Sequence, residues 1–140
     1  MTYLLDTDVV SAFNKATLSA KLAHWLGQHE QDCFISLVSI AEMRHGLTTA
    51  PEAHRPKLAQ RMADTEARFT ESFLPVDVDV LMRWKGLLTE LKSVQRTMTC
   101  EDSLIAATCL AGGHMLATNN LRHFEPARPV GLEVVNPLAA

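Results

Sequence analysis

Three acidic residues stand where predicted strands pass into predicted helices, and their type suits the binding of a cation. Asp6 follows a short apolar strand, Glu42 lies in the first turns of a helix, and Asp102 lies at the start of a later helix. In an open α/β sheet the carboxyl ends of the strands form the edge where ligand clefts lie, so we expect the three carboxylates in one cleft. Converging carboxylates repel one another unless a cation neutralises them. An oxygen-only set favours Mg²⁺ or Mn²⁺, and such a site supports phosphoryl chemistry by activating water.

Each acidic position also has a structural interpretation that needs no ligand. A carboxylate near a helix N-terminus, such as Glu42, is stabilised by about 0.3–1 kcal/mol. Thr7 or Asp8 is expected to cap a short helix over 9–13, and Thr7 can also support Asp6 beside it. The metal-site hypothesis therefore rests on the shared placement of the three acids and not on any one of them.

The elements that must position these acids alternate between strands and helices. Apolar runs without alternation are typical of a parallel sheet covered on both faces, and the order indicates a doubly wound, mostly parallel sheet with short strands. Within it, Pro56 is expected to split or delay one helix. Strands are predicted at 3–5, 33–36, 74–76, 115–117 and 133–135, and helices at 9–13, 18–28, 39–47, 49–71, 79–91 and from Thr99 to Gly112. The inward face of the helix at 79–91 is expected to consist of Leu81, Trp84, Leu88 and Leu91.

Composition narrows the classes of function. A length of 140 residues suits one domain over 1–140. The formal net charge of −3 excludes nucleic-acid binding by bulk positive charge. Aromatic residues make up only 6% of the chain, which argues against a platform on which bases stack. Any nucleic-acid chemistry must therefore use local basic residues or a bound cation.

The cysteines and the apolar runs bear on the cellular compartment. Cys33, Cys100 and Cys109 form no C-x-x-C pair and are odd in number, so a reducing compartment is expected and all three are predicted to be small buried side chains. Asp6 and Asp8 interrupt the stretch where a signal peptide would be apolar. No apolar run approaches the length of a membrane span. The expected location is the cytoplasm.

Four segments form a recognisable pattern when they are taken together and in order: LLDTDVV (4–10), SLVSIAEMRHGL (36–47), EDSLIAATCLAGGHMLATNNLRHF (101–124) and GLEVVNP (131–137). With this pattern the chain resembles the PIN domains, specifically the VapC-type ribonuclease toxins of toxin–antitoxin pairs. The resemblance implies a three-layer α/β/α sandwich with a short-stranded, mostly parallel central sheet. It implies Asp6, Glu42 and Asp102 as the metal-binding and catalytic acids, Mg²⁺ or Mn²⁺ as the cofactor, and RNA as the substrate. It also implies a homodimer and a cognate VapB-type antitoxin that masks the site.

The chain departs from this family at one place. Many members carry a fourth acid just past the fourth strand, where this chain has the run 118–124 with Asn120 or His123 in acid positions. Neither side chain adds negative charge, so the number of bound metals is left open. Thr7, Thr118 and Asn120 are candidates for supporting the acids or contacting the substrate.

Apolar and basic residues in the first half of the chain indicate a partner surface. The segment 49–71 is the most basic element, and with Leu47 and Trp25 it offers more apolar surface than a small core needs. An antitoxin helix followed by an extended tail would fit such a groove.

Two other classes of protein share part of the pattern. Asp6-Thr7-Asp8 fits the start of haloacid-dehalogenase-like phosphatases, with Asp6 as nucleophile and Asp8 as acid/base. The late paired-aspartate motif of those enzymes is missing, since only Glu101-Asp102 is available. A PIN-like interaction module without catalysis is the third hypothesis.

Overall fold

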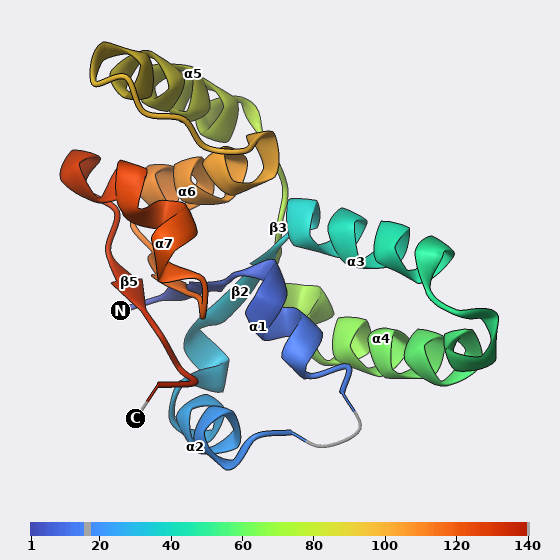
Figure 1. Cartoon of the computed structure of the whole chain (residues 1–140). Coiled ribbons are helices and arrows are strands. Elements are labelled where there is room, and N and C mark those ends of the chain that lie inside the picture. The colour runs from blue at the N-terminus through green and yellow to red at the C-terminus, as the bar shows by residue number, and fades with distance from the viewer. Residues whose placement is uncertain (16–17, 140) are drawn as a thin grey trace.

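A parallel sheet of five short strands forms the centre of the computed structural model, which describes residues 1–15 and 18–139. The strand order is β3-β2-β1-β4-β5, and each neighbouring pair is parallel (Figure 1). The central position of β1 places its carboxyl end between β2 and β4, which is the place where a cleft is expected. The strands are β1 (Tyr3–Leu5), β2 (Cys33–Ser36), β3 (Phe73–Leu74), β4 (Met115–Ala117) and β5 (Val134–Val135).

Helices cover both faces of the sheet, as the sequence predicted. Leu4 and Leu5 of β1 are fully buried but point to opposite faces, and each belongs to a different core. Leu5 packs with α1 to α4, and Leu4 packs with α5, α6 and the C-terminal segment, so the sheet lies between two layers (Figure 1). The helices are α1 (Thr7–Ala12), α2 (Ala20–His29), α3 (Leu37–Thr49), α4 (Arg55–Phe69), α5 (Val78–Ser93), α6 (Cys100–Gly112) and α7 (Leu121–Phe124). Short 3-10 turns occupy Glu30–Asp32, Glu52–His54, Thr70–Ser72 and Glu125–Val130.

Proline residues account for two differences from the predicted boundaries. The third strand pairs only through Phe73–Leu74 and not over 74–76, because Pro75 has no N–H to give to a neighbouring strand. Pro56 lies in the first turn of α4, where a missing N–H costs nothing. The predicted helix at 49–71 is therefore split, and its main part begins at Arg55.

Helix α5 is rotated from the predicted orientation. Val80, Leu87 and Leu91 are buried, whereas Leu81 and Leu88 are 41% and 37% exposed, so the prediction that these two face inward is wrong. Apolar residues occupy both sides of this helix, so periodicity alone cannot select the buried side. Packing against α6 selects it, and there Trp84 Nε1 donates a hydrogen bond of 2.8 Å to Ser103 Oγ.

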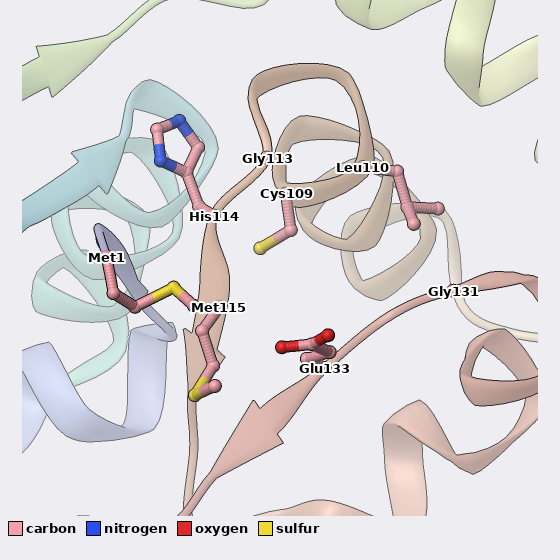
Figure 2. Close-up of a pocket in the computed structure, with 8 residues that line it drawn as sticks. All are labelled: Met1, Cys109, Leu110, Gly113, His114, Met115, Gly131 and Glu133. Atoms are coloured by element: carbon pink, nitrogen blue, oxygen red, sulfur yellow. The ribbon is translucent and has the colours of Figure 1, made fainter.

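The amino-terminal edge of the sheet has a hollow of its own. Met1, His114 and Glu133 lie around a cavity of about 200 Å³ (Figure 2). These residues precede β1, β4 and β5, so the cavity lies at the end of the sheet opposite Asp6. Burial there lowers the pKa of His114, whose Nδ1 lies 2.7 Å from Thr2 Oγ1. These contacts join the starts of β1 and β4 and involve none of the predicted site acids.

The burial of the cysteines and the length of the helices can both be compared with the sequence analysis. Cys33 and Cys109 are buried as predicted, but Cys100 is exposed because it is the first residue of α6 and faces outward. No helix within 1–15 or 18–139 is long and apolar enough to cross a membrane.

Candidate active site

Asp6 lies at the junction of β1 and α1 and is almost completely buried, with 5% of its surface exposed. Its backbone N–H donates to Ala117 O at 2.9 Å, so the residue is held against the end of β4. Its side chain caps α1, because Oδ1 accepts a hydrogen bond of 2.8 Å from the N–H of Thr7. The predicted caps Thr7 and Asp8 are therefore wrong: the strand passes into the helix without a loop, and the cap position falls on Asp6.

The second oxygen of Asp6 is also held by the protein. Thr118 Oγ1 donates to Asp6 Oδ2 at 2.8 Å, and the Thr118 hydroxyl accepts in turn from the N–H of Asn120 at 2.9 Å. Burial, together with the charge of Asp8, raises the pKa of Asp6 to about 7, although the hydrogen bonds from Thr118 and Thr7 act in the opposite direction. The carboxylate of Asp6 is therefore held firmly in position, but its surroundings neutralise its negative charge poorly.

Glu42 approaches the same edge from α3. The helix is capped by Ser36, whose hydroxyl accepts from the N–H of Val38 at 3.1 Å. Thr7 Oγ1 donates to Glu42 Oε1 at 2.7 Å and lies 2.8 Å from Ser39 Oγ, so one threonine connects α1 to α3. This contact provides a physical reason for the placement of Thr7 next to Asp6 in the sequence.

The electrostatics of Glu42 show that α6 contributes to this edge as well. Partial burial, followed by the charges of Glu101 and Asp102, raises the pKa of Glu42, and the hydrogen bond from Thr7 opposes the change. Acids of α3 and α6 therefore repel one another across the cleft. A cation bound between them would remove that repulsion.

Asp102 lies in the first turn of α6 and is partly exposed. The helix is capped by Thr99, whose Oγ1 accepts from the N–H of Asp102 at 3.1 Å. Asp102 Oδ2 lies 3.5 Å from Nδ1 of His123. The sequence places His123 only among the residues in acid positions, and the structure brings its ring to one of the candidate acids.

Asp8 is a second residue whose position the sequence did not explain. Its Oδ2 accepts a hydrogen bond of 3.0 Å from the N–H of Asn119, which ties α1 to the turn after β4. That turn carries Thr118 and therefore determines the hydroxyl that holds Asp6. The close pairing of Asp6 with Asp8 was the available signal, but the sequence alone suggested a helix cap or a phosphatase acid.

The donor set suits a hard divalent cation in its chemistry. Asp6, Glu42 and Asp102 come from three elements and offer only oxygen atoms. Within residues 1–15 and 18–139, no three acidic, histidine or cysteine side chains are spaced to share one ion. Burial raises the pKa of Asp6 and of Glu42, and repulsion from neighbouring acids adds to it: from Asp8 for Asp6, and from Glu101 and Asp102 for Glu42. A bound cation would relieve this repulsion.

Comparison with known proteins gives consistent matches along the chain. A family model of the PIN domain matches residues 3–128. VapC ribonuclease Y4jK of Sinorhizobium fredii is 31% identical over 137 residues, with 96% of each chain covered. Plasmid stability protein StbB of Pseudomonas syringae is 28% identical over 140 residues, with 98% of this chain and 99% of that protein covered. The crystal structure of FitAcB from Neisseria gonorrhoeae has a TM-score of 0.85 at 23% identity and covers 99% of this chain and 100% of its own, which shows a shared fold.

A parallel sheet between two helical layers, with carboxylates at the carboxyl ends of its strands, defines an α/β/α protein with an acidic cleft. The chain belongs to the PIN-domain family, since the family model covers β1 to β4 and all the helices between them. The 31% identity over nearly the whole length places it with the VapC-type members. The predicted resemblance and fold class are confirmed, and a haloacid-dehalogenase-like phosphatase is not favoured.

We predict that Asp6→Asn stabilises the metal-free protein above neutral pH. The folded state, where the pKa of Asp6 is about 7, retains a proton that the unfolded state, with a pKa of about 3.8, has released. Wild-type stability should therefore fall as pH rises from about 4 through about 7, and the amide should remove this fall and add about 1–3 kcal/mol at high pH.

Urea unfolding in EDTA at about pH 5 and about pH 8 measures this difference. Asp64→Asn changes an exposed carboxylate on α4 and serves as the control. Parallel pH dependence in the Asp6→Asn and wild-type proteins would contradict the prediction.

Proposed function

We propose that this protein is a metal-dependent endoribonuclease, and that it is the toxin of a VapBC-type toxin–antitoxin pair. The observation that carries the proposal is the placement of Asp6, Glu42 and Asp102 at the carboxyl end of the sheet, where burial, and then the charge of neighbouring acids, raises the pKa of Asp6 and of Glu42. Two relatives, from Sinorhizobium fredii and Rickettsia felis, are named as VapC ribonucleases. The chemistry of the site and the names of these relatives support the same reaction.

Asp6, Asp102 and Glu42 are the residues that would hold Mg²⁺ or Mn²⁺, with Glu42 either direct or through water. When bound, the cation would lower the pKa of water and polarise the scissile phosphate. The protein keeps two carboxylates in place with hydroxyl groups: Thr118 fixes Asp6, and Thr7 fixes Glu42. Each threonine hydroxyl donates one hydrogen bond to its carboxylate, so each carboxylate keeps further lone pairs for a ligand.

Local basic residues are needed for RNA binding by an acidic chain. Lys15 lies beside the site, lining hollows on either side of α1. Arg44, which follows Glu42 closely in sequence, forms an ion pair with Glu66 and joins α3 to α4. We therefore assign phosphate binding to the bound cation and to Lys15, with Asn120 at the mouth of the second hollow as a candidate for contact with the substrate.

Replacing Asp6, Glu42 or Asp102 with the matching amide should abolish RNA cleavage while the fold is retained. Each change removes a charged ligand, and loss of one ligand weakens binding of a hard cation. Cleavage of a labelled RNA in Mg²⁺ or Mn²⁺, with and without EDTA, measures activity, and circular dichroism measures folding.

Glu133→Gln is the matched control. Glu133 lines the cavity at the amino-terminal end of the strands (Figure 2), whereas the candidate acids lie at their carboxyl end. Full activity of Asp102→Asn, or activity that survives excess chelator, would refute the proposed mechanism. Absence of RNA cleavage by the wild-type protein under every metal condition would favour the non-catalytic interaction module instead.

A groove beside the acids supports the proposed antitoxin. A hollow of about 310 Å³ has Thr7 and Glu42 on its wall together with Leu47, Leu58 and Met62 of α3 and α4. Its apolar part would accept the hydrophobic side of a helix, and a following arginine could reach Glu42 with a charge-assisted hydrogen bond. The solved VapBC complex from Salmonella typhimurium, with a TM-score of 0.84 at 21% identity and coverage of 98% of each chain, shows that this fold occurs in such a complex.

Leu58→Ala should weaken retention of the antitoxin by roughly tenfold, because it removes an apolar contact from the groove. Co-purification with the product of the adjacent reading frame, followed by competition binding, measures the loss. RNA cleavage by the isolated variant should persist. Val94→Ala, at an exposed residue just after α5, is the control. Equal retention by both variants would place the antitoxin elsewhere.

The outer side of α5 supports the proposed homodimer. Val78 and Met82 are 72% and 66% exposed, and Leu81 and Leu88 are also exposed. Asp79 lies in the first turn of the helix and Lys92 in its last turn, so two copies packed antiparallel would place opposite charges together. Light scattering on the purified protein gives its mass, and a monomer at micromolar concentration would contradict a stable dimer.

A further inference from the structure

His123 brings a ring nitrogen atom to the acidic edge. Its Nδ1 lies 3.5 Å from Asp102 Oδ2. Its position is fixed by the backbone, since the N–H of His123 donates to Asn120 O at 3.1 Å. Phe124, the next residue, is completely buried and anchors α7 in the core. The ring therefore faces Asp102 because of the fold of the segment after β4.

The distance between these two atoms is informative. A charge-assisted hydrogen bond between a ring nitrogen and a carboxylate is typically about 2.7–2.9 Å long, and the observed 3.5 Å is longer than that. Two donor atoms that bind the same ion at about 2.1 Å each, with an angle between about 90° and 110°, are roughly 3.0–3.5 Å apart. The spacing of His123 and Asp102 matches two ligands of one cation.

We propose that His123 is a metal ligand, binding through Nδ1 the same divalent cation as Asp102. The inference rests on the proposed metal-dependent function and specifies the ligand set of that site. An imidazole takes the place that an acid occupies in many family members, and the side chain that contacts Asp102 is that of His123 and not the amide of Asn120. The cation is then held by oxygen and nitrogen together.

A nitrogen ligand changes which metal the site prefers. Mg²⁺ takes oxygen ligands almost exclusively, whereas imidazole suits transition metals. Mn²⁺ accepts both kinds of donor and lies above Mg²⁺ in affinity for such mixed sites. The protein is therefore expected to bind Mn²⁺ more tightly than Mg²⁺.

The alternative is an ion pair between a protonated His123 and Asp102 that has no part in metal binding. The two arrangements predict opposite effects of removing the ring. A lost ligand weakens Mn²⁺ binding, whereas a lost positive charge beside Asp102 strengthens it.

Loading the metal-free protein with Mn²⁺ alone, near neutral pH, tests the inference without any measurement of activity. Pulsed electron paramagnetic resonance of the wild-type protein should detect ¹⁴N coupled to Mn²⁺. His123→Gln should lose that coupling and raise the dissociation constant for Mn²⁺ by roughly tenfold or more, as measured by calorimetry. The same variant should change Mg²⁺ binding less. His123→Asp should restore the binding of Mn²⁺. His24→Gln, at an exposed histidine of α2, should behave as the wild type.

Each outcome distinguishes the two levels of the argument. Mn²⁺ binding without ¹⁴N coupling in the wild type, or tighter Mn²⁺ binding by His123→Gln, overturns the role of His123 and leaves the proposed nuclease intact. Absence of Mn²⁺ and Mg²⁺ binding by the wild type overturns both. Thermal unfolding of each variant shows whether the fold has been kept.

Discussion

The site depends on the burial of one carboxylate at the end of the central strand. Asp6 is enclosed by β1, β4 and α1, and its two oxygens accept hydrogen bonds from Thr118 and from the N–H of Thr7. The same residue is the last point of the strand, the cap of the first helix and the innermost acid of the cleft. The geometry of the fold and the position of the acid are therefore set by the same contacts.

Hydroxyl groups extend this arrangement to the neighbouring elements. The hydroxyl of Thr7 links α1 to Glu42 on α3. The carboxylate of Asp8 links α1 to the turn after β4 by accepting a hydrogen bond from the N–H of Asn119. These contacts cross large separations in sequence, so each aligns two elements that the chain itself does not connect. Burial raises the pKa of both carboxylates, and neighbouring acids add to the effect: Asp8 for Asp6, and Glu101 with Asp102 for Glu42. Packing in the two cores offsets the free-energy cost of these buried, mutually repelling charges, as is common at functional sites.

The surface proposed for the antitoxin and the surface proposed for self-association lie on different helices. The groove between α1, α3 and α4 joins apolar side chains to Glu42 and suits a peptide that enters the cleft. The exposed side of α5 is remote from that groove and lies on the other layer (Figure 1). In the proposed function, the antitoxin and a second copy of the chain would therefore occupy different surfaces.

Local sequence determined much of this protein. Continuous apolar runs identified the buried strands, Thr99 and Gly113 defined the ends of α6, and the order of segments indicated the family, because each of these signals depends on residues close together in the chain. Tertiary structure decided the rest. The buried side of α5 was settled by packing on α6, since both sides of that helix are apolar. The cap of α1 moved to Asp6 because the strand ends without a loop. The partners of Thr118, Asp8 and His123 lie across elements, and no local pattern encodes the distance between side chains that only the folded sheet brings together.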